Sequence, residues 1–201
     1  SVIYNAAREP EIVDLQALLR SMGARVNGAG GSIITVEGGT ALHGCTHRVI
    51  GDRIVCATYL CAAAAAGGEV RLTGVDYRAV STVALSLAES GCEVRSEADA
   101  VSLRSTGALR SVRPVRTAPY PGFPTDAQPV LMAALLRSEG CTVFVENIFE
   151  NRYRHVDELS RMGAEIRVAG RVAVVNGVRT LHGAAVKCTD LRGGAALVIA
   201  G

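Results

Sequence analysis

Apolar and polar positions near the start of the chain change from a strand period to a helix period and back. The pattern predicts a strand, an amphipathic helix and two more strands at residues 2–5, 10–22, 24–26 and 33–36. Gly23 ends the predicted helix, and a glycine-rich turn at 28–31 separates the last two strands. Because that turn joins two antiparallel strands, it is predicted to be a hairpin turn and not a phosphate-binding loop.

The same order of elements returns twice. It recurs as strand, helix, strand, strand at 69–72, 77–90, 92–95 and 101–103, and at 142–146, 154–162, 165–168 and 172–175. The predicted helices end in similar sequences, and each stops at a glycine, Gly23, Gly91 or Gly163. These glycines are about 70 residues apart, a period that predicts a repeated β-α-β-β unit.

A second kind of helix alternates with the first and is apolar nearly all round. Each is preceded by an aspartate: Asp52 before 54–66, Asp126 before 130–136, and Asp190 before 195–200. A helix without a polar face is predicted to be buried on all sides. The sequence therefore predicts an α/β fold in which small-residue helices occupy the centre and antiparallel sheets lie outside them.

Composition narrows the class of protein further. The chain has 201 residues, 49% apolar and 20% charged, with a formal net charge of +2. This length allows one or two domains with a real core. The arginines are scattered along the sequence, which argues against a nucleic-acid partner. The longest apolar run, 54–66, is too short to cross a bilayer, so no membrane partner is expected.

The six cysteines have no regular spacing. Cys56, Cys61 and Cys141 sit in or beside apolar runs and are predicted to be buried free thiols. Free thiols are typical of a reducing compartment, so a cytoplasmic location is expected. The cluster His43-x-Cys45-x-His47 has ligand residue types but no fourth ligand at zinc spacing, and we predict no metal site.

The segment 117–128 has an unusual design. Three prolines stiffen it, and it ends at Thr125 and Asp126 beside the start of an apolar helix. One hypothesis is structural: Thr125 or Asp126 caps the helix, and Gln128 completes a capping box with Thr125. The other is chemical: the rigid lead-in holds the Asp126 carboxylate in one place. Capping would explain Asp52 and Asp190 equally well.

A second polar segment, 146–155, is too rich in charged groups for a plain strand-to-helix turn. Arg152, Arg154 and His155 are candidates to gather an anion, since the arginine fork suits carboxylate and phosphate groups. A solvated loop is the alternative.

With these residues in view, the chain resembles the bacterial enolpyruvyl transferases that start peptidoglycan synthesis, the UDP-N-acetylglucosamine 1-carboxyvinyltransferases. The strongest passages are residues 5–14, 119–128, 148–153, 159–164 and 189–192. The resemblance implies two domains, each an inside-out α/β barrel built from three copies of one unit. Residues 1–48 would be the tail of the first domain and 49–201 most of the second. The chain would cover about half of a typical member, and both of its ends look cut.

The resemblance also implies an activity. These enzymes move the enolpyruvyl group of phosphoenolpyruvate onto the 3-hydroxyl of UDP-N-acetylglucosamine, release phosphate, and need no cofactor. Matching positions imply six site residues here. Asp126 would be the general base and a sugar-nucleotide ligand, and Ile148 a backbone contact to the sugar nucleotide. Arg152, Asp190 and Arg192 would lie near phosphoenolpyruvate, and Glu9 would be a cleft residue.

Two departures limit this expectation. The family's general-acid cysteine belongs to the first domain, and none of the six cysteines here matches it. Gly51 and Val55 replace a usual proline and glutamate, so Arg53 is given no role. We therefore expect the chain to be inactive alone and to need the rest of the first domain. The alternatives are a shikimate-pathway enolpyruvyl transferase, which the passages 123–126 and 150–152 argue against, and a non-catalytic module of the same fold.

Overall fold

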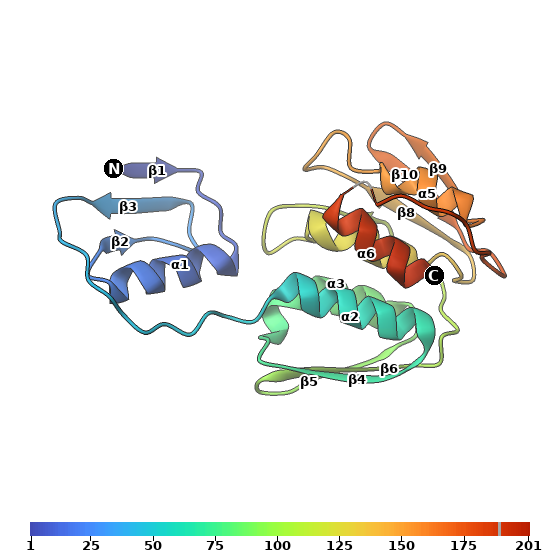
Figure 1. Ribbon diagram of the computed structural model, residues 1–201, viewed down its shortest axis with the longest axis horizontal. Coiled ribbons are helices and arrows are strands. Elements are labelled where there is room, and N and C mark those ends of the chain that lie inside the picture. The colour runs from blue at the N-terminus through green and yellow to red at the C-terminus, as the bar shows by residue number, and fades with distance from the viewer. Residues whose placement is uncertain (189) are drawn as a thin grey trace. The chain divides into compact units, whose positions relative to one another are not determined.

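The computed structural model describes residues 1–188 and 190–201, which leaves Thr189 of the passage 189–192 outside the described residues (Figure 1). The chain divides into two compact units. The first unit comprises Ser1–Gly51 and Pro119–Pro121, and the second comprises Asp52–Ala118 and Gly122–Gly201. Each unit is considered by itself.

The first unit contains the first copy of the repeat. Its elements are β1 (Val2–Tyr4), α1 (Pro10–Ser21), β2 (Arg25–Asn27) and β3 (Ile33–Glu37). The strands pair antiparallel in the order β1-β3-β2, so the last strand of the copy lies in the centre of the sheet. The predicted strand–helix–hairpin order is confirmed.

The second unit contains two further copies with the same plan. They are β4 (Gly68–Thr73), α3 (Tyr77–Glu89), β5 (Glu93–Ser96) and β6 (Ala100–Ser105), and β8 (Cys141–Val145), α5 (His155–Arg161), β9 (Glu165–Ala169) and β10 (Val172–Asn176). The last strand is again central in each sheet. A short strand that the pattern did not predict, β7 (Val115–Arg116), adds to β8 in parallel.

The three helix ends share one backbone geometry. Gly23, Gly91 and Gly163 have φ angles of 93°, 110° and 92°, which a side chain would strain. The amide after each glycine donates to a carbonyl five residues earlier, and the glycine amide donates three residues back. These paired bonds define a Schellman motif, which is why a glycine recurs at each helix end.

A further shared feature was not recognised in the sequence. After each hairpin the chain returns to the helix end, where one amide donates to the carbonyl just before the glycine. The donors and acceptors are His43 and Met22 at 2.9 Å, Arg110 and Ser90 at 3.0 Å, and His182 and Met162 at 2.9 Å. In two copies the histidine ring also covers the glycine. A Cβ built on Gly163 would lie 3.0 Å from the His182 ring.

The apolar helices α2 (Arg53–Ala66), α4 (Gln128–Ala134) and α6 (Leu191–Ala200) lie between the two sheets of the second unit (Figure 1). Every residue of α4 is buried, as predicted. The prediction is wrong for α2 and α6, which pack on α4 and on neighbouring elements but are not buried on all sides. Their other sides expose Val55, Tyr59, Leu191 and Val198. The mixed α/β class is confirmed.

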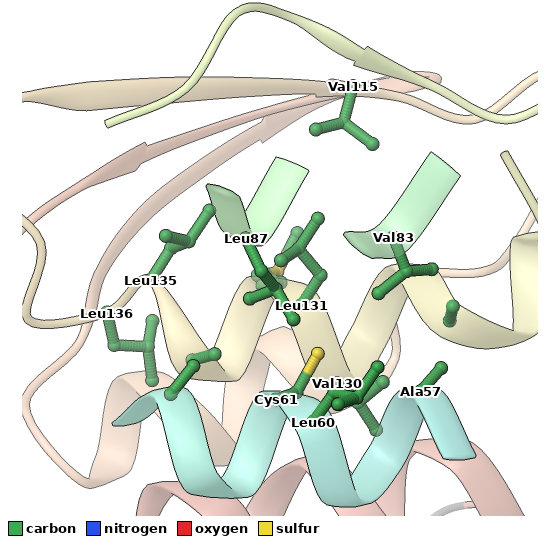
Figure 2. Packing of buried hydrophobic residues seen from close by; sticks show 14 of the residues in the cluster. Ala57, Leu60, Cys61, Val83, Leu87, Val115, Val130, Leu131, Leu135 and Leu136 are labelled. Carbon is green, nitrogen blue, oxygen red and sulfur yellow. The ribbon is translucent and has the colours of Figure 1, made fainter. Parts of the chain in front are cut away.

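The core of the second unit is aliphatic. Leu60 and Cys61 of α2 pack against Leu131 of α4, and Leu87 of α3 completes the layer (Figure 2). No helix among the described residues is both long and apolar enough to serve as a transmembrane span.

The cysteines among the described residues are all free thiols. Burial raises the pKa of the Cys56 thiol to about 11 and raises that of Cys61 further, since desolvation disfavours the thiolate. The prediction that Cys141 is buried is wrong. Cys141 begins β8 on the outward-facing side of the alternation, whereas its neighbour Thr142 faces inward.

Candidate active site

Two of the three helix-start aspartates act as caps. Asp52 Oδ1 accepts hydrogen bonds from the amides of Ile54 and Val55 at 2.8 and 2.9 Å. Asp190 Oδ1 accepts from the amides of Arg192 and Gly193 at 3.0 and 2.8 Å. Both carboxylates therefore satisfy amides that the first helical turn leaves without partners.

Asp126 differs from these two. It lies in a short 3-10 turn, Thr125–Ala127, which we call the base turn, and no side chain caps the turn or α4. The hydroxyl of Thr125 donates instead to Glu146 Oε2 at 3.0 Å. The hypothesis that Thr125 or Asp126 caps the helix is therefore wrong. The Asp126 carboxylate is left to interact with other side chains.

Those side chains are two arginines from distant segments. Arg152 Nη2 lies 2.7 Å from Asp126 Oδ1, and Arg192 approaches Oδ2 with Nε at 3.2 Å and Nη2 at 3.1 Å. The Asp126 side chain is 40% exposed, the arginine side chains only 16% and 23%. Two guanidinium groups therefore converge on one accessible carboxylate. The guanidinium fork suits anions that carry carboxylate or phosphate groups.

Arg152 reaches this position from the loop 147–154 between β8 and α5, which we call the anion loop. Arg192 is the second residue of α6 and is placed by the Asp190 cap. The structure thus brings together three of the six expected site residues, Asp126, Arg152 and Arg192. A fourth, Asp190, caps the helical turn that carries Arg192. The side chain of Arg192 donates to Asp126, whereas its backbone amide donates to Asp190.

Glu146 also belongs to this site, although the sequence pattern did not predict it. This residue is fully buried, and its carboxylate accepts from the Thr117 and Thr125 hydroxyls and from the amides of Ile148 and Phe149. The strand pattern could have indicated that Glu146 is buried. Residues two apart on a strand share a face, so Glu146 lies on the same face as Thr142 and Phe144. This is the inward face of the strand, where a charged residue is rarely found.

The remaining expected residues occupy simpler positions. The backbone amide of Ile148 donates to Glu146 Oε1 at 2.8 Å. The carbonyl oxygen of Ile148 accepts no hydrogen bond from the described residues. Glu9 belongs to the first unit, at the N-cap position of α1, where its side chain makes no capping bond.

The predicted anion cluster of Arg152, Arg154 and His155 is not formed. His155 is fully buried, and neither ring nitrogen has a hydrogen-bond partner among the described residues. Burial lowers the pKa of His155 to about 4, because desolvation disfavours the charged imidazolium. The Asp190 carboxylate opposes this shift, and the charge of Arg152 adds a smaller lowering effect. A neutral imidazole holds no anion at neutral pH. The side chain of Arg154 is exposed, so Arg152 alone of the three joins the site.

The residues of the histidine–cysteine cluster have other contacts. His47 Nε2 lies 3.0 Å from Asp14 Oδ1, and the His43 ring covers Gly23. Within residues 1–188 and 190–201, no three metal-binding side chains gather in one place.

Comparison with known proteins assigns the chain to a family. The profile of the family described as EPSP synthase (3-phosphoshikimate 1-carboxyvinyltransferase) matches residues 1–201. A UDP-N-acetylglucosamine 1-carboxyvinyltransferase from Gluconacetobacter diazotrophicus is 53% identical over 99% of this chain and 47% of the relative. One from Caldanaerobacter subterraneus is 47% identical over all of this chain and 48% of the relative. The chain thus spans about half the length of these curated relatives.

Solved structures show the same fold. The enolpyruvyl transferase NikO from Streptomyces tendae superposes with a TM-score of 0.80 at 27% identity, over 100% of this chain and 48% of NikO. EPSP synthase from Acinetobacter baumannii gives 0.66 at 21% identity, over 92% of this chain and 46% of that one. From its full-length match to the family profile and its relatives at about half identity, the chain belongs to the EPSP synthase family of enolpyruvyl transferases.

Proposed function

We propose that this chain is part of an enzyme that moves the enolpyruvyl group of phosphoenolpyruvate onto the 3-hydroxyl of UDP-N-acetylglucosamine. The acceptor is supported by relatives at 47–53% identity that carry this activity in their names. The observation that carries the proposal is the position of Asp126. Among three aspartates at equivalent points of the repeat, it is the one that does not cap a helix and lies between two arginines.

The residues have the following roles in this proposal. Asp126 accepts the proton of the acceptor hydroxyl as its oxygen bonds to C2 of phosphoenolpyruvate, while C3 takes a proton. The tetrahedral intermediate then loses a proton from C3 and the C2–O bond to phosphate breaks. Arg152 and Arg192 bind the carboxylate and phosphate of the donor and stabilise the charge on the departing phosphate.

The ion pairs of Asp126 also matter for the order of events. Arginine side chains occupy both oxygens of the Asp126 carboxylate before the donor binds. Binding of an anionic donor gives both arginines a new partner, so Asp126 is released to take the hydroxyl proton. Asp190 holds the first turn of α6 and thereby Arg192, and the Ile148 carbonyl oxygen is available to an acceptor hydroxyl or amide.

The organisation of the whole enzyme is part of the proposal. Residues 1–48 would belong to a first domain and 49–201 to most of a second, each completed as an inside-out barrel. Glu9 would reach the substrate cleft from the first domain, which would also supply the general acid. The enzyme would act in the cytoplasm at the start of peptidoglycan synthesis, on which cell shape and division depend.

The test measures phosphate release from phosphoenolpyruvate with each of two acceptors, UDP-N-acetylglucosamine and shikimate 3-phosphate. We expect turnover with the first acceptor by the native polypeptide that contains residues 1–201, and none by residues 1–201 alone. Asp126→Asn should lower kcat by a factor on the order of 10² to 10⁴, as expected when a general base is lost. Asp99→Asn, an exposed aspartate between β5 and β6, is the matched control.

Three outcomes would contradict the proposal. Wild-type turnover by Asp126→Asn would remove the assigned base. Turnover with shikimate 3-phosphate alone would favour the other acceptor, which the family description names. Absence of turnover and of binding for both substrates would favour a non-catalytic module.

A further inference from the structure

Glu146 is a buried carboxylate without a cation. Its exposed fraction is 0%, and no salt bridge reaches it within the described part of the chain. Burial of a carboxylate is unfavourable unless hydrogen bonds replace the lost water. Here four donors do so: Thr117 Oγ1 at 2.9 Å, Thr125 Oγ1 at 3.0 Å, and the amides of Ile148 and Phe149 at 2.8 and 3.1 Å.

The donors fall into two groups, one on each carboxylate oxygen. Oε2 accepts from Thr125, which begins the base turn and directly precedes Asp126. Oε1 accepts from Thr117 and from two amides of the anion loop, which carries Arg152. One carboxylate therefore ties the base turn to the anion loop. These are the two segments whose side chains meet at 2.7 Å in the Asp126–Arg152 pair.

Thr117 strengthens this link from the other side. While its hydroxyl donates to Glu146, the same oxygen accepts from the Asn147 amide at 2.8 Å. The Asn147 side-chain amide in turn donates to the Thr117 carbonyl at 3.0 Å. The start of the anion loop is thus held by bonds that converge on Glu146.

We infer that Glu146 is a positioning residue for the transfer reaction, an inference that rests on the proposed function. It sets the separation of Asp126 and Arg152 by holding Thr125 on one oxygen and the anion loop on the other. It also occupies the Ile148 and Phe149 amides, so these two amides are not available to the acceptor. Glu146 itself touches no substrate in this assignment.

The experiment compares Glu146→Gln with Thr125→Val in the native polypeptide. Glu146→Gln keeps the size of the side chain but replaces one carboxylate oxygen with an NH2 group. This NH2 group cannot accept a hydrogen bond from the donors that it then faces. We expect kcat to fall by a factor on the order of 10², as found for small misplacements of reacting groups. Affinity for UDP-N-acetylglucosamine, measured by calorimetry, should fall as well because the anion loop moves.

Thr125→Val removes only the bond to the base turn and is nearly isosteric. It should lower kcat while UDP-N-acetylglucosamine affinity stays within twofold. This separation of kcat from affinity would not result from a general loss of stability. Glu165→Gln, which alters an exposed carboxylate paired with Asn176 on the sheet, is the control and should behave as wild type.

The outcomes separate this inference from the proposed function. If Asp126→Asn abolishes turnover while Glu146→Gln keeps kcat and affinity within twofold of wild type, the role of Glu146 is wrong and the function stands. If Thr125→Val leaves kcat unchanged, Glu146 does not act through the base turn, and the inference fails even where Glu146→Gln cannot be purified folded. If Asp126→Asn is fully active, the proposed function fails first.

Discussion

Arg192 donates from Nε to Asp126 Oδ2 at 3.2 Å across 66 residues of sequence, although Asp190 lies only two residues away. Asp190 accepts from the backbone amide of Arg192 instead, at 3.0 Å. One residue thus uses its backbone to complete a helix cap and its side chain to meet a second aspartate. The cap orients the first turn of α6, and this turn directs the guanidinium toward Asp126.

The first prediction concerns anion affinity at this pair. Asp126→Ala removes the carboxylate shared by Arg152 and Arg192, so both cations become available to another anion. Phosphoenolpyruvate should bind the variant about three- to tenfold more tightly even though turnover falls, since a partly exposed ion pair is worth roughly 1 kcal/mol. Calorimetry with phosphoenolpyruvate alone measures this.

Glu150→Ala is the matched control for that measurement. It removes an equal charge from the anion loop, but its carboxylate is exposed and pairs with Arg171 at 3.7 Å. Equal gains in both variants would mean that net charge, and not release of the two arginines, sets the affinity. Weaker binding by Asp126→Ala would contradict the prediction.

The second prediction follows from His155. Burial holds its pKa at about 4 in the folded chain, below the value near 6.5 expected when unfolded. Between these values the unfolded state binds more protons, so the free energy of unfolding falls as the pH is lowered from about 6.5 to about 4. Full stability from this group is present above pH ~6.5, and about 3 kcal/mol is lost below pH ~4.

Urea unfolding at several pH values, with His155→Phe for comparison, measures this effect. Phenylalanine fills a similar volume and does not titrate, so the variant should lose less stability on acidification. Other groups titrate equally in both proteins, and the difference isolates His155. Parallel pH profiles for the two proteins would show that His155 is not held neutral by the fold.

The third prediction compares two glycines with positive φ angles. Gly163 has a φ of 92°, and a Cβ there would lie 3.0 Å from the His182 ring, whereas Gly170 has a φ of 58° and no atom within 4 Å of such a Cβ. Both substitutions to alanine carry the backbone penalty of about 1–2 kcal/mol. Gly163→Ala should cost roughly 1–3 kcal/mol more because the ring must move.

Thermal or urea unfolding of the two alanine variants gives the comparison. The further variant Gly163→Ala with His182→Ala should recover the part of the loss that comes from crowding and leave the backbone part. Equal losses at the two glycines would mean that the histidine does not press on the helix end.

The fourth prediction concerns thiol reactivity. Cys56 and Cys61 are buried with raised pKa values, and Cys141 is exposed. The thiolate is the reacting form, so iodoacetamide at pH 8 should label Cys141 in the folded protein and the other two only after unfolding. Peptide mapping by mass spectrometry identifies each site. Labelling of Cys61 at the rate of Cys141 would show that the packing of α2 against α4 opens readily.

Features that depend on neighbouring residues, and that recur along the chain, could be predicted from the sequence. Gly23, Gly91 and Gly163 share one requirement, a left-handed residue after a helix, and their spacing predicted the repeated unit. Capping at Asp52 and Asp190 also follows from local preference. The same preference predicted a cap at Thr125, and that prediction is wrong because the Thr125 hydroxyl donates to Glu146. Glu146 is 21 residues away in the sequence, so the residues around Thr125 do not reveal this partner.

By itself the sequence determined the order and kind of the elements and the apolar character of α2, α4 and α6, since periodicity and turn residues act over a few neighbours. Only the tertiary structure decided which of three similar aspartates remains outside a helix cap, which arginines it meets, and which sides of α2 and α6 stay exposed. Those outcomes depend on contacts between segments tens of residues apart. Local preferences limit such contacts, but packing of the whole unit selects among them.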